Sequence, residues 1–213
     1  MRIIDISMEL RPGMIHWPDT TAPERMWEHR IVDGDANDAS RWLIPSHDGT
    51  HLDAPSHVIR GGAQAADADL ERLIGPARVV DVGDEVTAID ASVVARLDLA
   101  GVSRVLLRTS NSSLRIHATE FDPGYVALTG DGATALAQAG MRTVAVDYLS
   151  VELYGQPRPE AHLALFEAGI AVIEGCDLHD VEPGDYLLCC LPLRLLGSEA
   201  APARAVLIED AAW

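Results

Sequence analysis

Short segments rich in β-branched and aliphatic residues recur along almost the whole chain, and they constrain its fold more than any other feature. Segments of this length and composition, bounded by Gly, Pro, Asp or Ser, are typical of β-strands. Seven strands are predicted on this basis, at Arg2–Ser7, Ala77–Val82, Arg104–Thr109, Thr143–Tyr148, Ala171–Glu174, Asp185–Leu195 and Ala203–Ile208. Because only Gly197–Pro202 separates the last two, they are predicted to form an antiparallel hairpin.

Helical segments lie between some of these strands. The pattern predicts helices at Asp67–Ile74, Ala91–Leu99, Gly132–Ala139 and Glu160–Ala168, and the last two are each followed by Gly, where a left-handed C-cap is expected. Helices do not separate the strands regularly, so the chain is predicted to be α/β without a doubly wound sheet. At 213 residues the chain is long for one domain and short for two, and we interpret residues 1–213 as a single domain.

The segment from Pro12 to Pro45 has little periodicity and contains three tryptophans. Long irregular segments in compact domains are usually functional or extend to a partner. Trp17 is a candidate for substrate stacking, with an ordinary core tryptophan as the alternative. Trp27 and Trp42 are predicted to be structural.

The charge balance excludes several classes of partner. The chain has 33 acidic and 16 basic residues, a net charge of -17, and proteins bind phosphate backbones mainly through Lys and Arg. No nucleic-acid or anionic-membrane partner is therefore expected. The longest apolar run, Tyr186–Leu193, is far shorter than the roughly 20 residues of a membrane span. The early acid Asp5 is unlike a signal peptide, and three cysteines do not make a disulfide framework, so a cytoplasmic location is expected.

Four residues of the types that bind metals fall within one short segment: His47, His51, Asp53 and His57. Each of these histidines taken singly is better explained as a surface or core-bonded residue. The clustering of four such residues favours a metal site. In a fully extended chain, at about 3.3 Å per residue, His47 and His51 would lie roughly 13 Å apart, too far to share one ion.

Two bends are predicted within this segment. Asp48-Gly49 is a strong turn dipeptide, and Pro55 offers a second bend after Ala54. The chain is therefore predicted to fold back so that two imidazoles and a carboxylate meet. Such a donor set suits zinc and could also hold manganese or iron.

The segment His47-x-Gly49-Thr50-His51-x-Asp53-Ala54-Pro55-x-His57 resembles the signature of the cyclase superfamily of metal-dependent hydrolases, which includes bacterial kynurenine formamidases. Further similarities span the chain from Asp5 to Leu207. They comprise Trp17-Pro18, the Asp147-x-x-Ser150-Val151 turn, the His162 and Glu174 pair, and the tail from Leu191 to Leu207.

The resemblance implies a role for each matching residue. It assigns His47, His51 and Asp53 to a first divalent metal, and His162 and Glu174, with Asp53 bridging, to a second. The residues taken without the resemblance do not single out His162 or Glu174. One or two ions, most simply zinc with manganese as an alternative, are expected.

The resemblance also makes His57 the general acid/base and Trp17 a residue of the substrate pocket. It implies a swivelling β/β/α domain with a mixed, barrel-like sheet flanked by helices. A homodimer or higher homo-oligomer, with the N-terminal region reaching across, is expected.

The expected activity is metal-dependent hydrolysis of a small amide: an aryl formamide such as N-formylkynurenine, or a cyclic amide or lactone. Two departures put N-formylkynurenine itself in doubt. The sequence Trp17-Pro18-Asp19-Thr20-Thr21-Ala22-Pro23 lacks the Gly that usually follows Trp-Pro, and Asp147-Tyr148-Leu149-Ser150-Val151-Glu152 replaces Asp-Thr-Pro-Ser-Val-Asp. The alternatives are a natural-product (polyketide-type) cyclase or dehydratase that uses the same metal site, and a non-catalytic binding protein.

Overall fold

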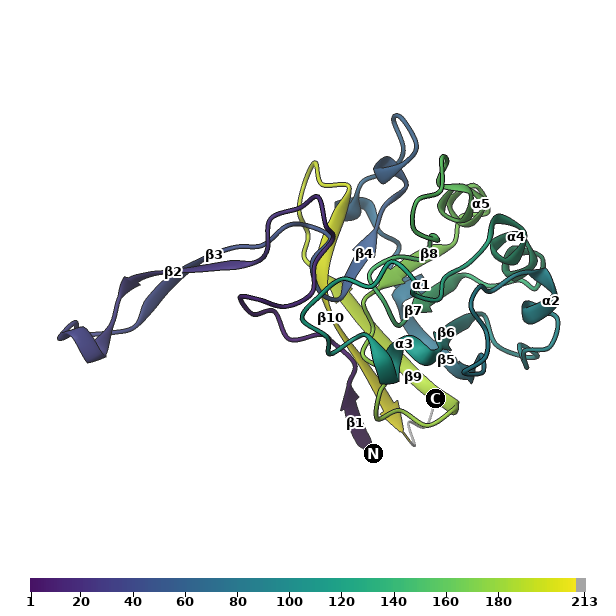
Figure 1. The fold of residues 1–213 in the computed structure, drawn as a ribbon, viewed down its shortest axis with the longest axis horizontal. Coiled ribbons are helices and arrows are strands. Elements are labelled where there is room, and N and C mark those ends of the chain that lie inside the picture. Colours follow the sequence, from purple (N-terminus) through teal and green to yellow (C-terminus); the bar gives the residue numbers. More distant parts are fainter. Residues whose placement is uncertain (210–213) are drawn as a thin grey trace.

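A closed, mixed β-barrel forms the centre of the molecule in a computed structural model that describes residues 1–209 (Figure 1). The order of the barrel strands is β4-β8-β7-β6-β5-β9-β10, and β10 pairs with β4 to close it. These strands are β4 (His51–Asp53), β5 (Ile74–Asp81), β6 (Arg104–Arg108), β7 (Thr143–Val146), β8 (Ala171–Glu174), β9 (Gly184–Pro192) and β10 (Ala200–Glu209). Strand β1 (Arg2–Asp5) pairs with the end of β10.

Parallel and antiparallel pairs occupy different parts of the barrel. Strands β5, β6, β7 and β8 run parallel to one another. All pairs that involve β1, β4, β9 or β10 are antiparallel, including β4 with β8 and β5 with β9. The helices are α1 (Leu70–Leu73), α2 (Ala91–Val94), α3 (Ser110–Leu114), α4 (Gly130–Gln138) and α5 (Glu160–Glu167). The model confirms the predicted α/β class and the mixed, barrel-like sheet flanked by helices.

Alternation along the strands builds two hydrophobic cores. On β6, Leu106 belongs to the core inside the barrel, whereas Val105 and Leu107 belong to the core between the sheet and the helices. Successive side chains of a strand point to opposite faces, so a strand buried on both faces reads as a continuous apolar run. Helices α2, α4 and α5 cover the outer face (Figure 1).

All seven predicted strands are present, and β9 and β10 form the predicted antiparallel pair. Two predicted helices were wrong in length. Helix α1 begins only at Leu70, where the side chain of Asp69 caps it by accepting a hydrogen bond from the N–H of Glu71. It ends at Leu73 because the chain then becomes extended, and Ile74 pairs with Cys189 of β9. Helix α2 ends at Val94 because the next hydrogen bonds, from Arg96 and Leu97, reach back only three residues and tighten the turn.

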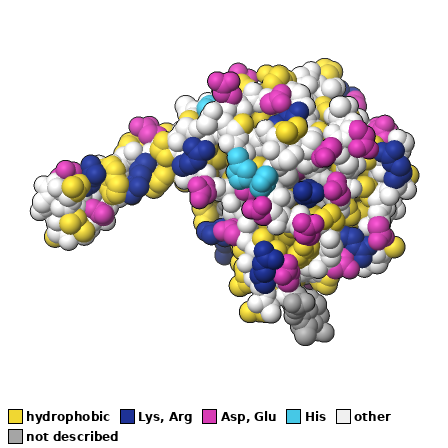
Figure 2. Space-filling view, turned by 60° about the horizontal axis from the view of Figure 1, so that its bottom comes forward, with side chains coloured by type: hydrophobic (Ala, Val, Ile, Leu, Met, Phe, Trp, Pro, Cys, Tyr) yellow, Lys and Arg dark blue, Asp and Glu magenta, His cyan; other side chains and the backbone are white. Residues whose placement is uncertain are grey.

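The segment predicted to be irregular contains a two-stranded hairpin, formed by β2 (Glu24–His29) and β3 (Ala39–Leu43). This hairpin, which we call the arm, projects from the barrel (Figure 1). Figure 2 shows hydrophobic and basic side chains along its surface. Trp27 and Trp42, which are predicted to be structural, lie outside the core: they are 41% and 37% exposed and lie beside Arg25 on the arm.

None of the helices within residues 1–209 combines the length and the apolar character needed to cross a bilayer.

Candidate metal centre

Strand pairing places three candidate ligands on one face of the barrel wall. In the antiparallel pair of β4 with β8, His51 lies opposite Glu174, and Leu52 lies opposite Ile173. Leu52 and Ile173 both belong to the core inside the barrel. Because successive side chains alternate, His51, Asp53 and Glu174 point outward, towards α5.

The turn before β4 returns His47 to the same place. Gly49 has a φ of 69°, and a Cβ at this position would lie 2.6 Å from Leu10 Cδ2, so glycine is strongly favoured here. Beyond this turn, His47 Nδ1 lies 2.9 Å and His51 Nε2 lies 3.2 Å from Asp53 Oδ1. The chain therefore folds back as predicted, and both imidazoles meet the Asp53 carboxylate.

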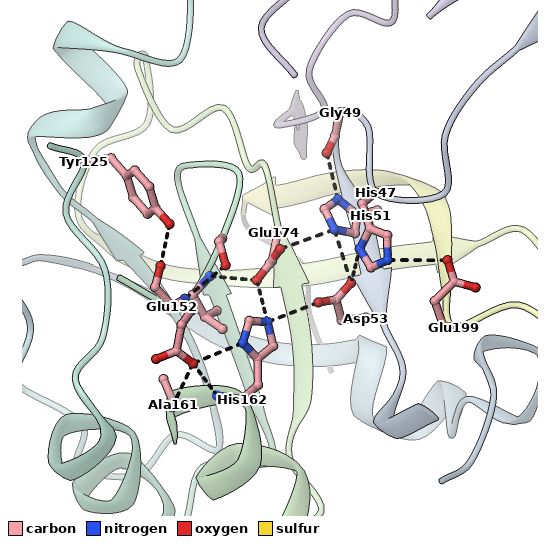
Figure 3. A network of polar contacts seen from close by, with 12 residues as sticks. His47, Gly49, His51, Asp53, Tyr125, Glu152, Ala161, His162, Glu174 and Glu199 are labelled. Carbon is pink, nitrogen blue, oxygen red and sulfur yellow. Dashed lines mark hydrogen bonds and ion pairs between the residues drawn. The ribbon is translucent and has the colours of Figure 1, made fainter. Parts of the chain in front are cut away.

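Helix α5 supplies a third imidazole from the opposite side (Figure 3). His162 Nε2 lies 3.3 Å from Asp53 Oδ2 and 3.3 Å from Glu174 Oε1. The other oxygen of Glu174 lies 3.3 Å from His51 Nε2. The structure thus brings His162 and Glu174 to the same centre as the ligand-type residues of the 47–53 segment.

His57 lies beside the centre, at the end of a 3-10 turn over Pro55–His57. Its ring centroid is 4.3 Å from that of His47 and 5.5 Å from that of His162. His47, Asp53 and His57 each offer a ligand atom within 4.8 Å of the others, as do His51, Asp53 and Glu174. By geometry alone, His57 can either bind a metal or transfer protons.

The buried polar atoms at this centre fit a divalent cation. Both carboxylate oxygens of Asp53, together with Nε2 of His51 and Nε2 of His162, are buried without an aligned hydrogen-bond partner among the described residues. Buried polar groups are otherwise almost always hydrogen-bonded, so such exceptions require an explanation. His51 Nε2 lies 3.2 Å from Asp53 Oδ1, and His162 Nε2 lies 3.3 Å from Asp53 Oδ2, but neither pair is aligned as a hydrogen bond. This arrangement is expected if the four atoms converge on one or two cations.

The electrostatics of the metal-free centre follow from this clustering. Burial lowers the pKa of His51, but the carboxylates of Asp53 and Glu174, 3.2 Å and 3.3 Å from its Nε2, outweigh this effect and raise the pKa to about 10. Burial also opposes the charged form of His162, yet its carboxylate neighbours hold its pKa well above the usual value. Burial raises the pKa of Asp53, but the surrounding imidazoles bring it well below its usual range. In the metal-free protein, protons on His51 and His162 therefore balance the carboxylates.

These shifts predict how the stability of the metal-free protein depends on pH. The folded pKa of His51, about 10, lies above its ordinary value of 6.5, so protonated His51 stabilises the fold fully below pH 6.5. This contribution is lost as the pH rises from 6.5 to about 10, and His162 shifts in the same direction. The melting temperature of chelator-treated protein is expected to fall across this window. Differential scanning calorimetry checks this, with metal-loaded protein as the control, and a flat or rising profile would contradict it.

A cavity of about 350 Å³ opens onto the centre. Its walls include Trp17, His57, Leu149 and Leu153. Ligand pockets of this size are usual for small molecules. The Trp17 ring packs against Tyr154, with ring centroids 5.5 Å apart, so Trp17 is fixed at the wall of the cavity.

Two glutamates at the centre were not predicted from the sequence. Glu199, in the loop between β9 and β10, lies 3.5 Å from His47 Nε2 and accepts a hydrogen bond from Ser46 Oγ. Glu152 lies 3.3 Å from His162 Nδ1. No local pattern marks Glu199. Glu152 is the last residue of the Asp147–Glu152 motif, where the family usually has an aspartate. This match of one acid to another could have identified it from the sequence.

Comparison with known proteins places these features in a family. Residues 4–153 match the family described as putative cyclase. The chain is 36% identical to a kynurenine formamidase of Salinibacter ruber, covering 97% of each sequence. It is 37% identical to Cyclase-like protein 2 of Arabidopsis thaliana, covering 98% of this chain and 79% of that protein.

A solved structure agrees with the sequence comparison. A potential metal-dependent hydrolase with cyclase activity superposes with a TM-score of 0.84 at 32% identity, covering 97% of this chain and 96% of that one. The fold and the sequence are thus both shared over almost the whole length. The chain belongs to the putative cyclase family of metal-dependent hydrolases and resembles its kynurenine formamidases.

Proposed function

We propose that this protein hydrolyses a small amide, such as an aryl formamide or a cyclic amide, in a metal-dependent reaction. The observation that carries the proposal is Asp53. Both of its buried oxygens lack hydrogen-bond partners within residues 1–209, and they face the nitrogens of three histidines. The full-length similarity to kynurenine formamidases supports amide hydrolysis as the reaction class.

The ligand roles follow the positions of the side chains. His47, His51 and Asp53 would hold a first ion, and His162 and Glu174, with Asp53 between them, would hold a second. A bound zinc-type ion would lower the pKa of water from 15.7 to about 7 and polarise the substrate carbonyl. Manganese is the alternative metal for the same donors.

His57 is proposed to move the protons of the reaction. Partial desolvation of His57 in the cavity, together with the nearby His47 and His162, outweighs the Asp53 carboxylate and lowers the pKa of His57. Its imidazole is therefore neutral at pH 7 and can accept a proton from water. As the water oxygen bonds to the carbonyl carbon and the C–N bond breaks, His57 returns a proton to the leaving nitrogen. The products are an amine and a carboxylic acid, or a ring-opened amino acid from a cyclic amide.

Trp17 is proposed to stack on an aromatic substrate. Its ring stands at the wall of the cavity that also contains His57. Leu149 and Leu153 add apolar surface on the same cavity. An aryl group beside the amide would fill this space, because aromatic and aliphatic side chains favour burial of apolar area.

The test is hydrolysis by purified protein of a panel of N-formylanilines and cyclic amides, including N-formylkynurenine. We expect release of formate or of the ring-opened acid, loss of this activity after chelation, and recovery on addition of zinc or manganese. Elemental analysis of the same samples should find one or two ions per chain. Absence of turnover on the whole panel by metal-loaded protein would refute the proposal.

The similarity to a potential metal-dependent hydrolase with cyclase activity favours one alternative reaction. In this alternative reaction, the same centre would promote ring closure of a polyketide-type substrate, with His57 moving protons between carbon and oxygen. Mass spectrometry separates the two reactions. Hydrolysis adds the mass of water to a cyclic amide and divides a formamide into an amine and formate, whereas cyclisation with dehydration removes the mass of water from the substrate.

We also propose that the arm packs against a second copy of the chain. Its exposed hydrophobic side chains include Met26, Trp27, Trp42 and Leu43, and a two-stranded hairpin alone is marginally stable in water. Replacing Trp27 and Trp42 together with Ser is expected to shift the protein from dimer towards monomer in sedimentation equilibrium. Leu114→Ser, at an exposed leucine of α3, is the control, and an unchanged mass for the double variant would contradict the proposal.

A cytoplasmic location is proposed as well. Cys176, Cys189 and Cys190 are all free, as is usual for proteins in a reducing compartment.

A further inference from the structure

Helix α5, which carries His162, begins without a capping side chain of its own. Its N-cap residue is Pro159, which makes no side-chain hydrogen bond to the helix. The first N–H groups of a helix have no partner within the helix and must be satisfied from outside. Here the backbone N–H groups of Ala161 and His162 donate to Oε2 of Glu152, at 3.0 Å and 3.2 Å.

The same carboxylate oxygen also contacts the imidazole of His162. Its distance to His162 Nδ1 is 3.3 Å, with a geometry suited to a hydrogen bond (Figure 3). When Nδ1 carries the proton and donates to Glu152, Nε2 is left to face Asp53 and Glu174. A carboxylate that holds the outer nitrogen of a histidine fixes both its tautomer and the direction of its ring.

The backbone of Glu152 is itself held in place. Its N–H donates to Ser150 Oγ at 3.1 Å, and its carbonyl oxygen accepts a hydrogen bond from the hydroxyl of Tyr125, which is 2% exposed. The adjacent Val151 N–H donates to Glu174 Oε1 at 2.7 Å. One short segment thus positions both an imidazole and a carboxylate of the centre.

We propose that Glu152 is a positioning residue: it holds the first turn of α5 and Nδ1 of His162 together, and so directs His162 Nε2 at Asp53 and Glu174. The inference rests on the proposed metal-dependent function, because it assigns His162 an orientation suited to holding an ion. Glu152 also forms part of the cavity wall, but its Oε2 is engaged by the first turn of α5 and by His162 Nδ1, so its assigned role is to position His162.

A graded set of variants tests this role. Glu152→Ala removes the acceptor, and Glu152→Gln keeps an oxygen of the same reach without the negative charge. Glu160→Gln is the matched control, because Glu160 is an exposed acid in the first turn of the same helix. Zinc affinity is measured for each ion by competition with a chromophoric chelator, and imidazole ¹H–¹⁵N spectra are recorded with and without metal.

We expect Glu152→Ala to weaken the binding of one zinc ion per chain by about 10–100-fold, the usual cost of losing an outer partner of a ligand histidine. Glu152→Gln should weaken it less, because a neutral acceptor makes a weaker hydrogen bond than a carboxylate. In both variants the Nδ1–H signal of His162 should move, whereas Glu160→Gln should match the wild type in both measurements.

Several outcomes would overturn the inference. One is a Glu152→Ala protein that melts at lower temperature while its zinc affinities and His162 signal stay unchanged, since Glu152 would then only cap the helix. If Glu152→Ala fails to fold, Glu152→Gln decides, and its agreement with Glu160→Gln in both readouts rejects the proposal. Wild-type protein that binds no metal and hydrolyses no amide refutes the proposed function instead. The metal-free spectra would still report whether Glu152 holds His162.

Discussion

Replacing Asp53 with Asn is expected to reduce kcat/KM for amide hydrolysis by at least about 1000-fold. Losing a residue that only supports a metal ligand typically costs about 10–100-fold, and Asp53 is proposed to be a ligand itself. Asp53 is the residue on which His47, His51 and His162 all converge, within 2.9–3.3 Å. An asparagine has the same shape but no charge, and it replaces one acceptor oxygen with a donor. Metal content by elemental analysis is expected to fall with the activity.

The same substitution is expected to destabilise the metal-free protein. Removing one partner of a buried ion pair typically costs about 3–5 kcal/mol, because the remaining charge stays buried without compensation. Urea unfolding of chelator-treated protein measures this difference. Asp84→Asn, at an exposed position after β5, is the control and should leave stability and activity unchanged. Full metal content and activity in the Asp53 variant would remove the basis for the proposed centre.

Replacing His57 with Ala is expected to lower kcat by about 10²–10⁴-fold, the usual contribution of a general acid or base. The lowered pKa of His57 places its protonation below pH 6.5, so the wild-type rate should fall on the acid side of that value. This acid limb should disappear in the variant. Stopped-flow or steady-state rates between pH 5 and 8 provide the measurement.

Metal content distinguishes the two roles that the geometry allows for His57. A proton-transfer residue can be removed without loss of metal, whereas a ligand of the His47, Asp53 and His57 group cannot. We expect unchanged metal content in His57→Ala. His117→Ala, an exposed histidine paired with Asp177, is the control. Loss of metal together with activity would reassign His57 as a ligand.

The local part of the centre was predictable from contiguous residues. Asp48-Gly49 marks a turn, and the structure has Gly49 at a φ of 69°, where glycine is strongly favoured. The spacing of His51 and Asp53 on one short strand places both on the same face. Turn preference and strand alternation act within a few residues, so the sequence of the segment is sufficient to indicate them.

The distant part was predictable only through the resemblance to a family. His162 lies on α5 and Glu174 on β8, and neither has a local pattern that marks a ligand. They meet Asp53 because β8 pairs with β4 and α5 packs on the outer core. The predicted lengths of α1 and α2 were also wrong. Capping by Asp69 starts α1 three residues late and the pairing of Ile74 in β5 ends it, while tight turns after Val94 end α2 early.

The sequence by itself determined the α/β class, the seven strand segments and the fold-back of the ligand segment, because aliphatic density, alternation and turn chemistry are local properties. Only the tertiary structure decided which face of the barrel carries the centre, and that Glu152 and Glu199 lie beside Nδ1 of His162 and Nε2 of His47. It also decided that the tryptophans of the arm are exposed. The physical reason is that burial, charge and contact between distant residues depend on strand pairing and helix packing, which no short segment specifies alone.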